Sequence, residues 1–256
     1  MEAGCPASIP FWQVTEMIRA FVFDLDDTLY SYQTAHPYGY DAVRSYAEHT
    51  LGLDGGSFDR RIREIMAEYL DVMGSNCAAV HNRLIRFQQL VEPLGLPLAH
   101  VAVMDRLYWD TLMAHMERAP GVAEAMDELK ARGFKLGVGT NMTADYQFEK
   151  LSRLGLLDKL DFLVSSEEAG VEKPDPGLFL ACARKAGCES SQCVFVGDSL
   201  KHDVLGALSA GMPAVWYRPV PKESDAVPEG AVLIRSMSQL PGLAEELCRE
   251  GNRNEA

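Results

Sequence analysis

The sequence predicts an α/β protein: a Rossmann-like, doubly wound parallel sheet core with an inserted all-helical cap domain. From about residue 120, short runs rich in Val and Phe alternate with helical patterns. Strands that alternate with helices favour right-handed crossovers and a parallel sheet covered on both faces. Between residues 31 and 118, in contrast, helical patterns follow one another with no strand signal. These observations predict a sheet domain with a helical domain inserted into its chain.

Five apolar runs are the expected strands, because they are short and rich in β-branched and aromatic residues. The first, residues 18–24, comes before the helical segment and the others come after it. The later four are residues 134–140, 161–166, 193–198 and 213–217.

Helical patterns separate the later strands, and each closes on a glycine that suits a helix C-terminus. These patterns cover residues 122–133, 143–155, 175–187 and 202–211. Within the inserted segment, "RRIREIMAEYLDVM" (60–73) places its apolar residues on one helix face. Residues 80–91 and 103–116 are similarly helical.

The change in pattern sets the expected domain boundaries. Residues 17–30 and 119–249 form the discontinuous core, and residues 31–118 form the cap. Pro120 and Gly121 are candidates for a hinge between them. Residues 1–16 are expected to be an N-terminal extension and residues 250–256 a flexible polar tail.

Composition excludes several classes of protein. The 256 residues carry a net charge of -13, which disfavours nucleic acid and anionic lipid as partners. No run of eighteen apolar residues predicts a membrane span, and the first residues lack the basic leader and apolar stretch of a signal peptide. Six scattered cysteines lack zinc-site spacing and are expected to be thiols in a reducing compartment. We expect a cytoplasmic monomer or homodimer.

Polar and charged residues follow the predicted strands. The stretch "FVFDLDDTLY" ends a buried strand in Asp24, Asp26 and Asp27, and "GDSLKHD" supplies Asp198 and Asp203. The other groups at strand ends are Thr140, Asn141 and Lys173. In an open parallel sheet, ligands bind beyond the carboxyl ends of the strands, so these groups are expected to converge.

This set predicts metal-assisted phosphoryl transfer on a small phosphorylated molecule. Asp24 and Asp198 are suited to Mg2+, which prefers carboxylate oxygens and keeps sites for water and phosphate. Asp24 and Asp26 lie on the same side of an extended segment, so one can attack while the other handles protons. The hydroxyl of Thr140, the amide of Asn141 and the ammonium of Lys173 would bind phosphate oxygens.

Four segments, "DLDDT", "TN", "EKPDPGLF" and "GDSLKHD", resemble the motifs of the haloacid dehalogenase superfamily in order and spacing. The inserted helices resemble its type-one cap. The later motifs look closest to the branch that holds 5'-nucleotidases and sugar-phosphate phosphatases. The resemblance implies an aspartyl-phosphate intermediate on Asp24 and an acid and base role for Asp26. It also implies that Asp24, the carbonyl of Asp26 and Asp198 bind Mg2+, with Asp203 beside the metal.

Three rival functions stay open. A phosphomutase of the same superfamily also needs Asp26, and differs in how its cap excludes water. A haloacid dehalogenase has no need of the metal or of Asp26. A phospho-accepting signalling domain shares an aspartate, a Thr and a Lys, but its acidic pair precedes the nucleophile.

Residues of the predicted cap are weaker candidates. Asp27 is expected to cap a helix or loop rather than to act on substrate. Trp109 and Met113 are expected in the core of the cap. The residues that could reach a substrate are His36, Tyr38, His81, Arg83 and Arg86.

Overall fold

A computed structural model describes residues 17–221 and 225–254. Its centre is a six-stranded sheet in the order β3-β2-β1-β4-β5-β6, with every neighbouring pair parallel. The α/β fold class predicted from the sequence is confirmed. The strands are β1 (Ala20–Phe23), β2 (Lys135–Thr140), β3 (Phe162–Ser165), β4 (Cys193–Gly197), β5 (Ala214–Tyr217) and β6 (Ala231–Ile234).

Side chains of the central strand alternate between two apolar layers. Phe21 and Phe23 of β1 pack in one cluster, and Ala20 and Val22 pack in the other. Both faces are therefore buried, which explains why this strand has an unbroken apolar sequence.

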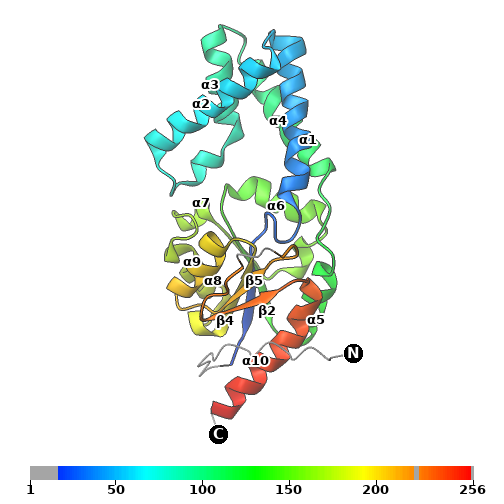
Figure 1. Ribbon diagram of the computed structural model, residues 1–256, viewed down its shortest axis with the longest axis vertical. Helices are drawn as coiled ribbons and strands as arrows, with labels where there is room; N and C mark the ends of the chain where they lie inside the picture. The colour runs from blue at the N-terminus through cyan, green and yellow to red at the C-terminus, as the bar shows by residue number, and fades with distance from the viewer. Residues whose placement is uncertain (1–16, 222–224, 255–256) are drawn as a thin grey trace.

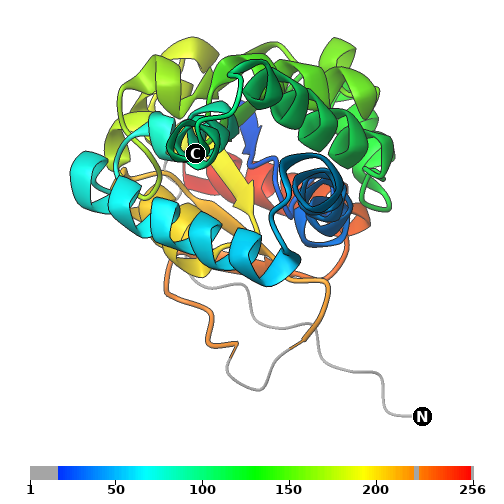
Figure 2. The same cartoon turned by 90° about the horizontal axis from the view of Figure 1, so that it is seen from above.

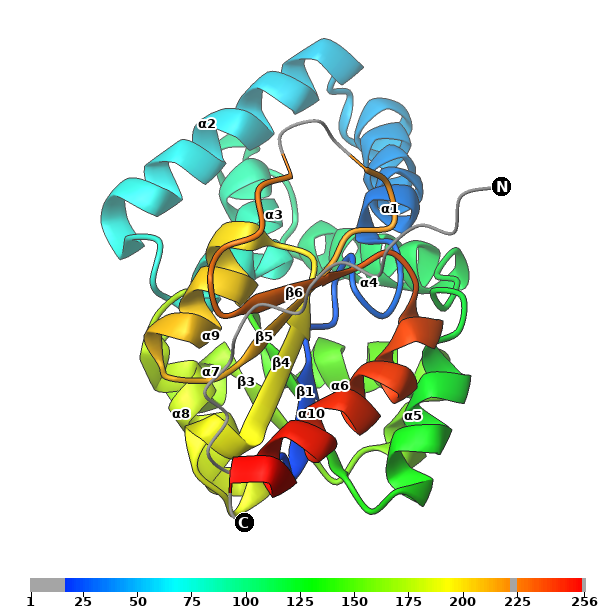
Figure 3. The ribbon, with the colours of Figure 1, turned by 60° about the horizontal axis from the view of Figure 1, so that its bottom comes forward.

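Helices cover the two faces of the sheet (Figure 3). One face carries α5 (Val122–Ala131), α6 (Ala144–Arg153) and α10 (Leu240–Asn254). The other carries α8 (Pro176–Ala186) and α9 (Leu205–Ser209), next to the short α7 (Ser166–Ala169). Seen from above, the sheet lies at the centre with helices around it (Figure 2).

Four helices lie between β1 and α5, beyond the carboxyl ends of the strands (Figure 1). Each of the first three begins at a polar residue whose side chain accepts a backbone N–H of the first turn, a common way of starting a helix. The helices are α1 (Tyr32–Tyr46), α2 (Gly55–Met73), α3 (Arg83–Val91) and α4 (Ala99–Ala114).

The chain enters and leaves these helices through two adjacent segments. Tyr30 forms an antiparallel bridge with Arg118, and the N–H of Ala119 donates to the carbonyl of Leu29 at 2.8 Å. Gly121 follows with a positive φ of 78°, which suits glycine. The sequence-based boundaries at residues 30 and 119 fall at this crossing and stay predictions.

Several local expectations differ from the structure. The edge strand β6 was not predicted, although its sequence AVLI is a short apolar run like those of the other strands. Residues predicted as one helix from 202 divide into a π-type turn, Leu200–Val204, and α9. Helix α10 continues to Asn254, so the predicted tail from residue 250 is helical over its described part.

No helix in the described part of the chain combines the length and hydropathy needed to cross a bilayer. Four of the cysteines are free thiols, namely Cys77, Cys182, Cys188 and Cys193. Cys5 lies outside the described residues.

Candidate metal and phosphate site

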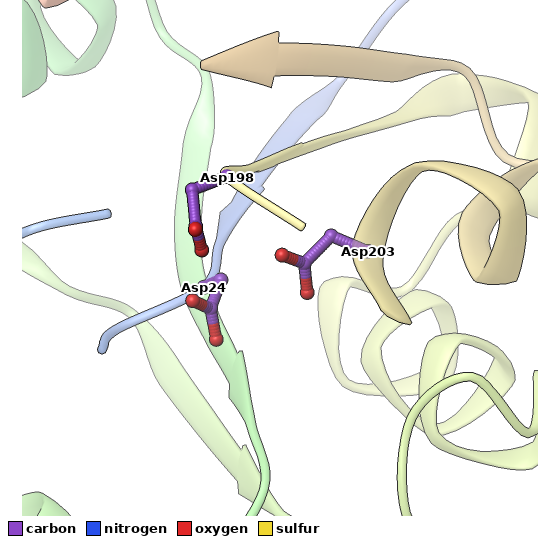
Figure 4. Close-up of side chains that lie close together, drawn as sticks. All are labelled: Asp24, Asp198 and Asp203. Carbon is purple, nitrogen blue, oxygen red and sulfur yellow. The ribbon is translucent and has the colours of Figure 1, made fainter. Parts of the chain in front are cut away.

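Three carboxylates gather beyond the ends of the two central strands. Asp24 follows β1, Asp198 follows β4, and Asp203 lies in the turn Leu200–Val204. One oxygen of each lies within 4.8 Å of the other two, and the side chains point toward a common centre (Figure 4). The strand order reverses between β1 and β4, which is where open α/β sheets bind ligands.

One buried lysine supplies the positive charge in this cluster. The ammonium of Lys173 contacts Asp24 Oδ1 and lies 2.8 Å from Asp203 Oδ1. Although burial opposes its charge, Asp203 and Asp24 raise the pKa of Lys173, so it stays protonated. A single ammonium therefore faces three carboxylates.

Burial and the excess of negative charge raise the pKa of two of these acids. Burial raises the pKa of Asp24 well above its usual value against the pull of Lys173, and repulsion from Asp203 and Asp198 adds to the rise. Burial, together with the charges of Asp203 and Asp27, raises the pKa of Asp198 to about 7. These groups are short of positive charge, which is the condition that a bound cation relieves.

Small and polar neighbours hold the acids in place. Thr28 Oγ1 donates to Asp24 Oδ2 at 3.2 Å and accepts the N–H of Asp198 at 3.1 Å. The N–H of Ser199 donates to Asp203 Oδ2 at 2.9 Å. A Cβ at Gly197 would fall 2.5 Å from the side chain of Asp203, so only glycine fits there.

Asp26 lies beside this cluster and has its own cation. Lys150 Nζ, on α6, lies 2.7 Å from Asp26 Oδ1, and the hydroxyl of Tyr30 donates to the same oxygen. Although burial acts in the opposite direction, these contacts and Gln147 lower the pKa of Asp26. In this structure Asp26 is therefore a carboxylate in an ion pair.

The end of β2 is tied to the same region. Gln147 Nε2 lies 2.6 Å from Thr140 Oγ1 and 3.4 Å from Asp26 Oδ2. Asn141 Oδ1 accepts the N–H of Lys173 at 2.8 Å, which fixes the loop that carries the lysine. The six residues predicted to act in catalysis or metal binding thus lie at one edge of the sheet, with Asn141 beside them.

The inserted helices touch the core next to Lys173. His81 Nε2 lies 2.9 Å from Glu172 Oε2, and Asn76 Oδ1 accepts the N–H of Glu172 at 2.6 Å. Glu172 is buried and also accepts Ser166 Oγ at 3.0 Å. This contact joins the segment between α2 and α3 to the phosphate-binding side of the sheet.

The predicted cap residues have different surroundings. Trp109 and Met113 are buried, as predicted. Asp27 Oδ1 accepts the N–H of Gln33 at 3.0 Å, so it caps the first turn of α1. Tyr38 stacks on His115, with ring centroids 3.9 Å apart. The remaining candidates, His36, His81, Arg83 and Arg86, line one cavity.

Sequence reasoning missed Lys150, Gln147 and Glu172. The first two lie on α6, where a polar residue reads as solvent-facing, yet both are fully buried. The signal was present for Lys150, since it lies four residues after Tyr146 and four before Leu154, on the face of those apolar residues. Glu172 lies in the motif "EKPDPGLF", but no role was predicted for it.

A doubly wound sheet with an acidic cluster, a buried lysine and helices inserted after the first strand is consistent with a hydrolase that uses an aspartate. A family model described as haloacid dehalogenase-like hydrolase matches residues 18–211. The chain therefore belongs to the haloacid dehalogenase-like hydrolases, as the sequence motifs indicated.

Two relatives and two solved structures place it within the family. It is 37% identical over 226 residues to a glyceraldehyde 3-phosphate phosphatase of Methanopyrus kandleri, covering 83% of this chain and 92% of the relative. It is 34% identical to a ribulose-1,5-bisphosphate 5-phosphatase of Halopiger xanaduensis, covering 82% and 88%.

The structural matches include a dehalogenase and a phosphatase. A 2-haloacid dehalogenase from Pseudomonas syringae matches with a TM-score of 0.74 and 31% identity, covering 90% of this chain and 99% of the other. A phosphatase of the same family from Thermococcus onnurineus matches with a TM-score of 0.68 and 26% identity, covering 88% and 97%.

Proposed function

We propose that this protein is a Mg2+-dependent phosphatase that hydrolyses a phosphomonoester of a small metabolite through an aspartyl-phosphate on Asp24. The observation that carries the proposal is the convergence of Asp24, Asp198 and Asp203 around one ammonium, that of Lys173. A phosphate dianion could not join three carboxylates unless further positive charge were present.

The donor set fits Mg2+. It consists of hard carboxylate oxygens close enough to share one ion, and it leaves room for water and phosphate oxygens. Asp24 and Asp198 would hold the ion together with the backbone carbonyl of Asp26, and Asp203 would hold Lys173 beside it. The bound cation would supply charge neutralisation for the transferring phosphoryl group.

The residues of the site would then divide the work. A carboxylate oxygen of Asp24 would attack phosphorus, while Lys173, Thr140 and the amide of Asn141 bind the equatorial oxygens. Water would next attack phosphorus and release Asp24. Each step transfers one phosphoryl group and needs no other reactant.

Asp26 would transfer the protons. Its ionised form, paired with Lys150, suits removal of a proton from the hydrolytic water. Protonation of the leaving alcohol needs the acid form. A phosphate dianion close by would raise the pKa of Asp26, because a like charge disfavours ionisation.

Relatives support phosphatase chemistry over the alternatives. The two phosphatases named above cover most of this chain at 34% and 37% identity. A dehalogenase is the second candidate because of the Pseudomonas structure, yet that reaction uses neither Asp26 nor a metal-binding pair of acids. We also propose a cytoplasmic location, which the free thiols favour.

Phosphate release from a panel of sugar phosphates, nucleoside monophosphates and p-nitrophenyl phosphate tests the proposal. Release that requires Mg2+ and stops with EDTA is expected. Chloride release from a 2-haloacid without Mg2+, with no phosphate release from the panel, would instead make the protein a dehalogenase.

A further inference from the structure

Two arginines of the inserted helices share a cavity that no step above uses. The cavity has a volume of about 230 Å3 and lies between α1, α2, α3 and α4. Its polar lining is basic or neutral: His36, His81, Arg83 and Arg86 contribute to it, and no carboxylate does. The rest of the lining is apolar or aromatic.

The guanidinium groups have neutral partners only. Arg83 donates to the hydroxyl of Tyr32 at 2.7 Å and to the carbonyl of His81, and Arg86 donates to the carbonyl of Val80. Within the described residues neither guanidinium takes part in an ion pair, and Asp105 is the carboxylate whose charge acts on Arg83 from outside the cavity. The Nε of Arg86 is buried and has no hydrogen-bond partner at all.

The lining of the cavity thus carries two guanidinium charges and no carboxylate, in a protein whose net charge is -13. Burial, reinforced by the charge of Arg83, lowers the pKa of Arg86 to about 10. Burial and the same two arginines lower the pKa of His36, so it stays neutral. Both arginines are half-buried, and charges withdrawn from water are ordinarily paired, so an anion would complete this site.

The cavity adjoins the phosphate site at two points. Tyr32 lines it, and the ammonium of Lys150, the partner of Asp26, lies 6.0 Å from the Tyr32 ring. His81 also lines it and binds Glu172, which accepts Asn141 Nδ2 at 3.4 Å. A substrate whose phosphate meets Asp24 would therefore extend its leaving group toward the two arginines.

We propose that Arg83 and Arg86 bind a second anionic group, a phosphate or a carboxylate, on the alcohol that the phosphatase releases. The substrate class is accordingly a bisphosphate or a phosphorylated acid rather than a phosphomonoester with a neutral alcohol. Guanidinium forks suit both groups, because they offer paired N–H donors to two oxygens. This inference rests on the proposed phosphatase function.

Matched pairs of compounds test the second anion. Fructose 1,6-bisphosphate is compared with fructose 6-phosphate, and 3-phosphoglycerate with glycerol 3-phosphate. Binding is measured by calorimetry on Asp24→Asn with Mg2+, and kcat/KM is measured on the protein with Asp24 intact. In at least one pair, the compound with the second anionic group is expected to show an affinity and a kcat/KM about 10- to 100-fold higher. That is the range for hydrogen bonds to charged groups.

Variants assign that preference to the arginines. Arg86→Gln and Arg83→Gln are expected to remove the preference for the second anionic group. The affinity and kcat/KM for the compounds without that group should change less than threefold. Arg60→Gln, an equal charge change at an exposed position of α2, is the control and should change nothing. The second-anion site is wrong if no compound with the second anionic group is preferred. It is also wrong if the Gln variants weaken binding of both compounds of a pair equally.

The outcomes separate this inference from the function it rests on. Phosphate release without any charge preference would leave the phosphatase and remove the anion site. Charge-dependent binding that Arg86→Gln abolishes, with no phosphate release from any compound, would keep the anion site and remove the phosphatase. If Arg86→Gln fails to fold, the preference of the wild-type protein and the effect of Arg83→Gln still decide.

Discussion

Asp26 and Lys150 form an ion pair in which one member is fully enclosed by protein. Besides Asp26, Lys150 faces the rings of Tyr30 and Trp109, with its ammonium 5.7 and 5.5 Å from the centroids. A buried ammonium among aromatic rings has few other partners, so it restricts where the carboxylate of Asp26 lies. We infer that Lys150 is a positioning residue for Asp26.

Lys150→Met keeps the length of the side chain and removes its charge. We expect kcat for an alkyl phosphate to fall about 10²-fold, the scale of effect that misplacing a catalytic group has. The measurement is kcat in the wild-type and Asp26→Asn backgrounds.

The second background supplies the control for Lys150. If it acts through Asp26, Lys150→Met should add less than threefold to the loss in Asp26→Asn. An equal loss in both backgrounds would show a structural role alone, and the inferred positioning would be wrong.

At the scale of elements, α1 and α4 approach each other closely at Gly39. A Cβ at that position would lie 2.7 Å from the carbonyl oxygen of Tyr108 and 3.3 Å from Leu112 Cβ. Backbone atoms cannot move aside as a flexible side chain can, so the helices would have to separate. This spacing also sets where Tyr108 stands, and its hydroxyl lies 2.8 Å from His36 Nδ1.

Gly39→Ala is therefore expected to destabilise the protein by about 1–3 kcal/mol, the usual cost of overpacking. Gly242→Ala is the matched control, because a Cβ there meets nothing within 4 Å and alanine favours the helix. Urea unfolding measures both. A neutral or stabilising effect of Gly39→Ala would mean that α1 and α4 pack less closely than described.

The elements differ in how far the sequence predicts them. β1 and β4 are continuous apolar runs that end in acids, and both properties follow from burial on two faces and from the site at their ends. β6 is also a short apolar run, but no acid follows it and its two middle residues are only partly buried, so it was missed. The site residues that lie within short motifs are likewise predictable from the sequence. They are Asp24, Asp26, Asp198 and Lys173.

Other parts of the site depend on how distant elements pack. Lys150 and Gln147 become site residues only because α6 packs with its polar positions toward β1 and β2. Arg83 and Arg86 share a cavity only because α1, α2, α3 and α4 pack around it. The two arginines have no local sequence signal, since arginine on a helix is more often exposed. For Lys150 the signal is its place on the apolar face of its helix.

At the scale of the whole molecule, negative charge predominates and is concentrated at the acidic cluster. Burial of these acids, together with repulsion between Asp198 and Asp203, opposes folding, and both effects raise the pKa of Asp198. A cation that binds only the folded protein relieves that repulsion. Mg2+ should therefore stabilise the fold by mass action.

Thermal unfolding with and without Mg2+ tests this linkage. At about 100 times its Kd, Mg2+ should add about 2.7 kcal/mol, which is roughly 5–10 °C for a protein of this size. Asp198→Asn should remove most of that shift, while its metal-free form should be at least as stable as the wild type. An equal shift in both proteins would place the metal elsewhere.

The central claim is that Asp24 attacks phosphorus, and its most direct test is the rate of phosphate release by Asp24→Asn with Mg2+ and the best substrate. Asparagine is nearly isosteric but is not a nucleophile of comparable strength, so a loss of at least about 10³-fold is expected, with an unchanged far-UV circular dichroism spectrum. A variant that keeps its fold and retains more than a tenth of the wild-type rate would contradict the account.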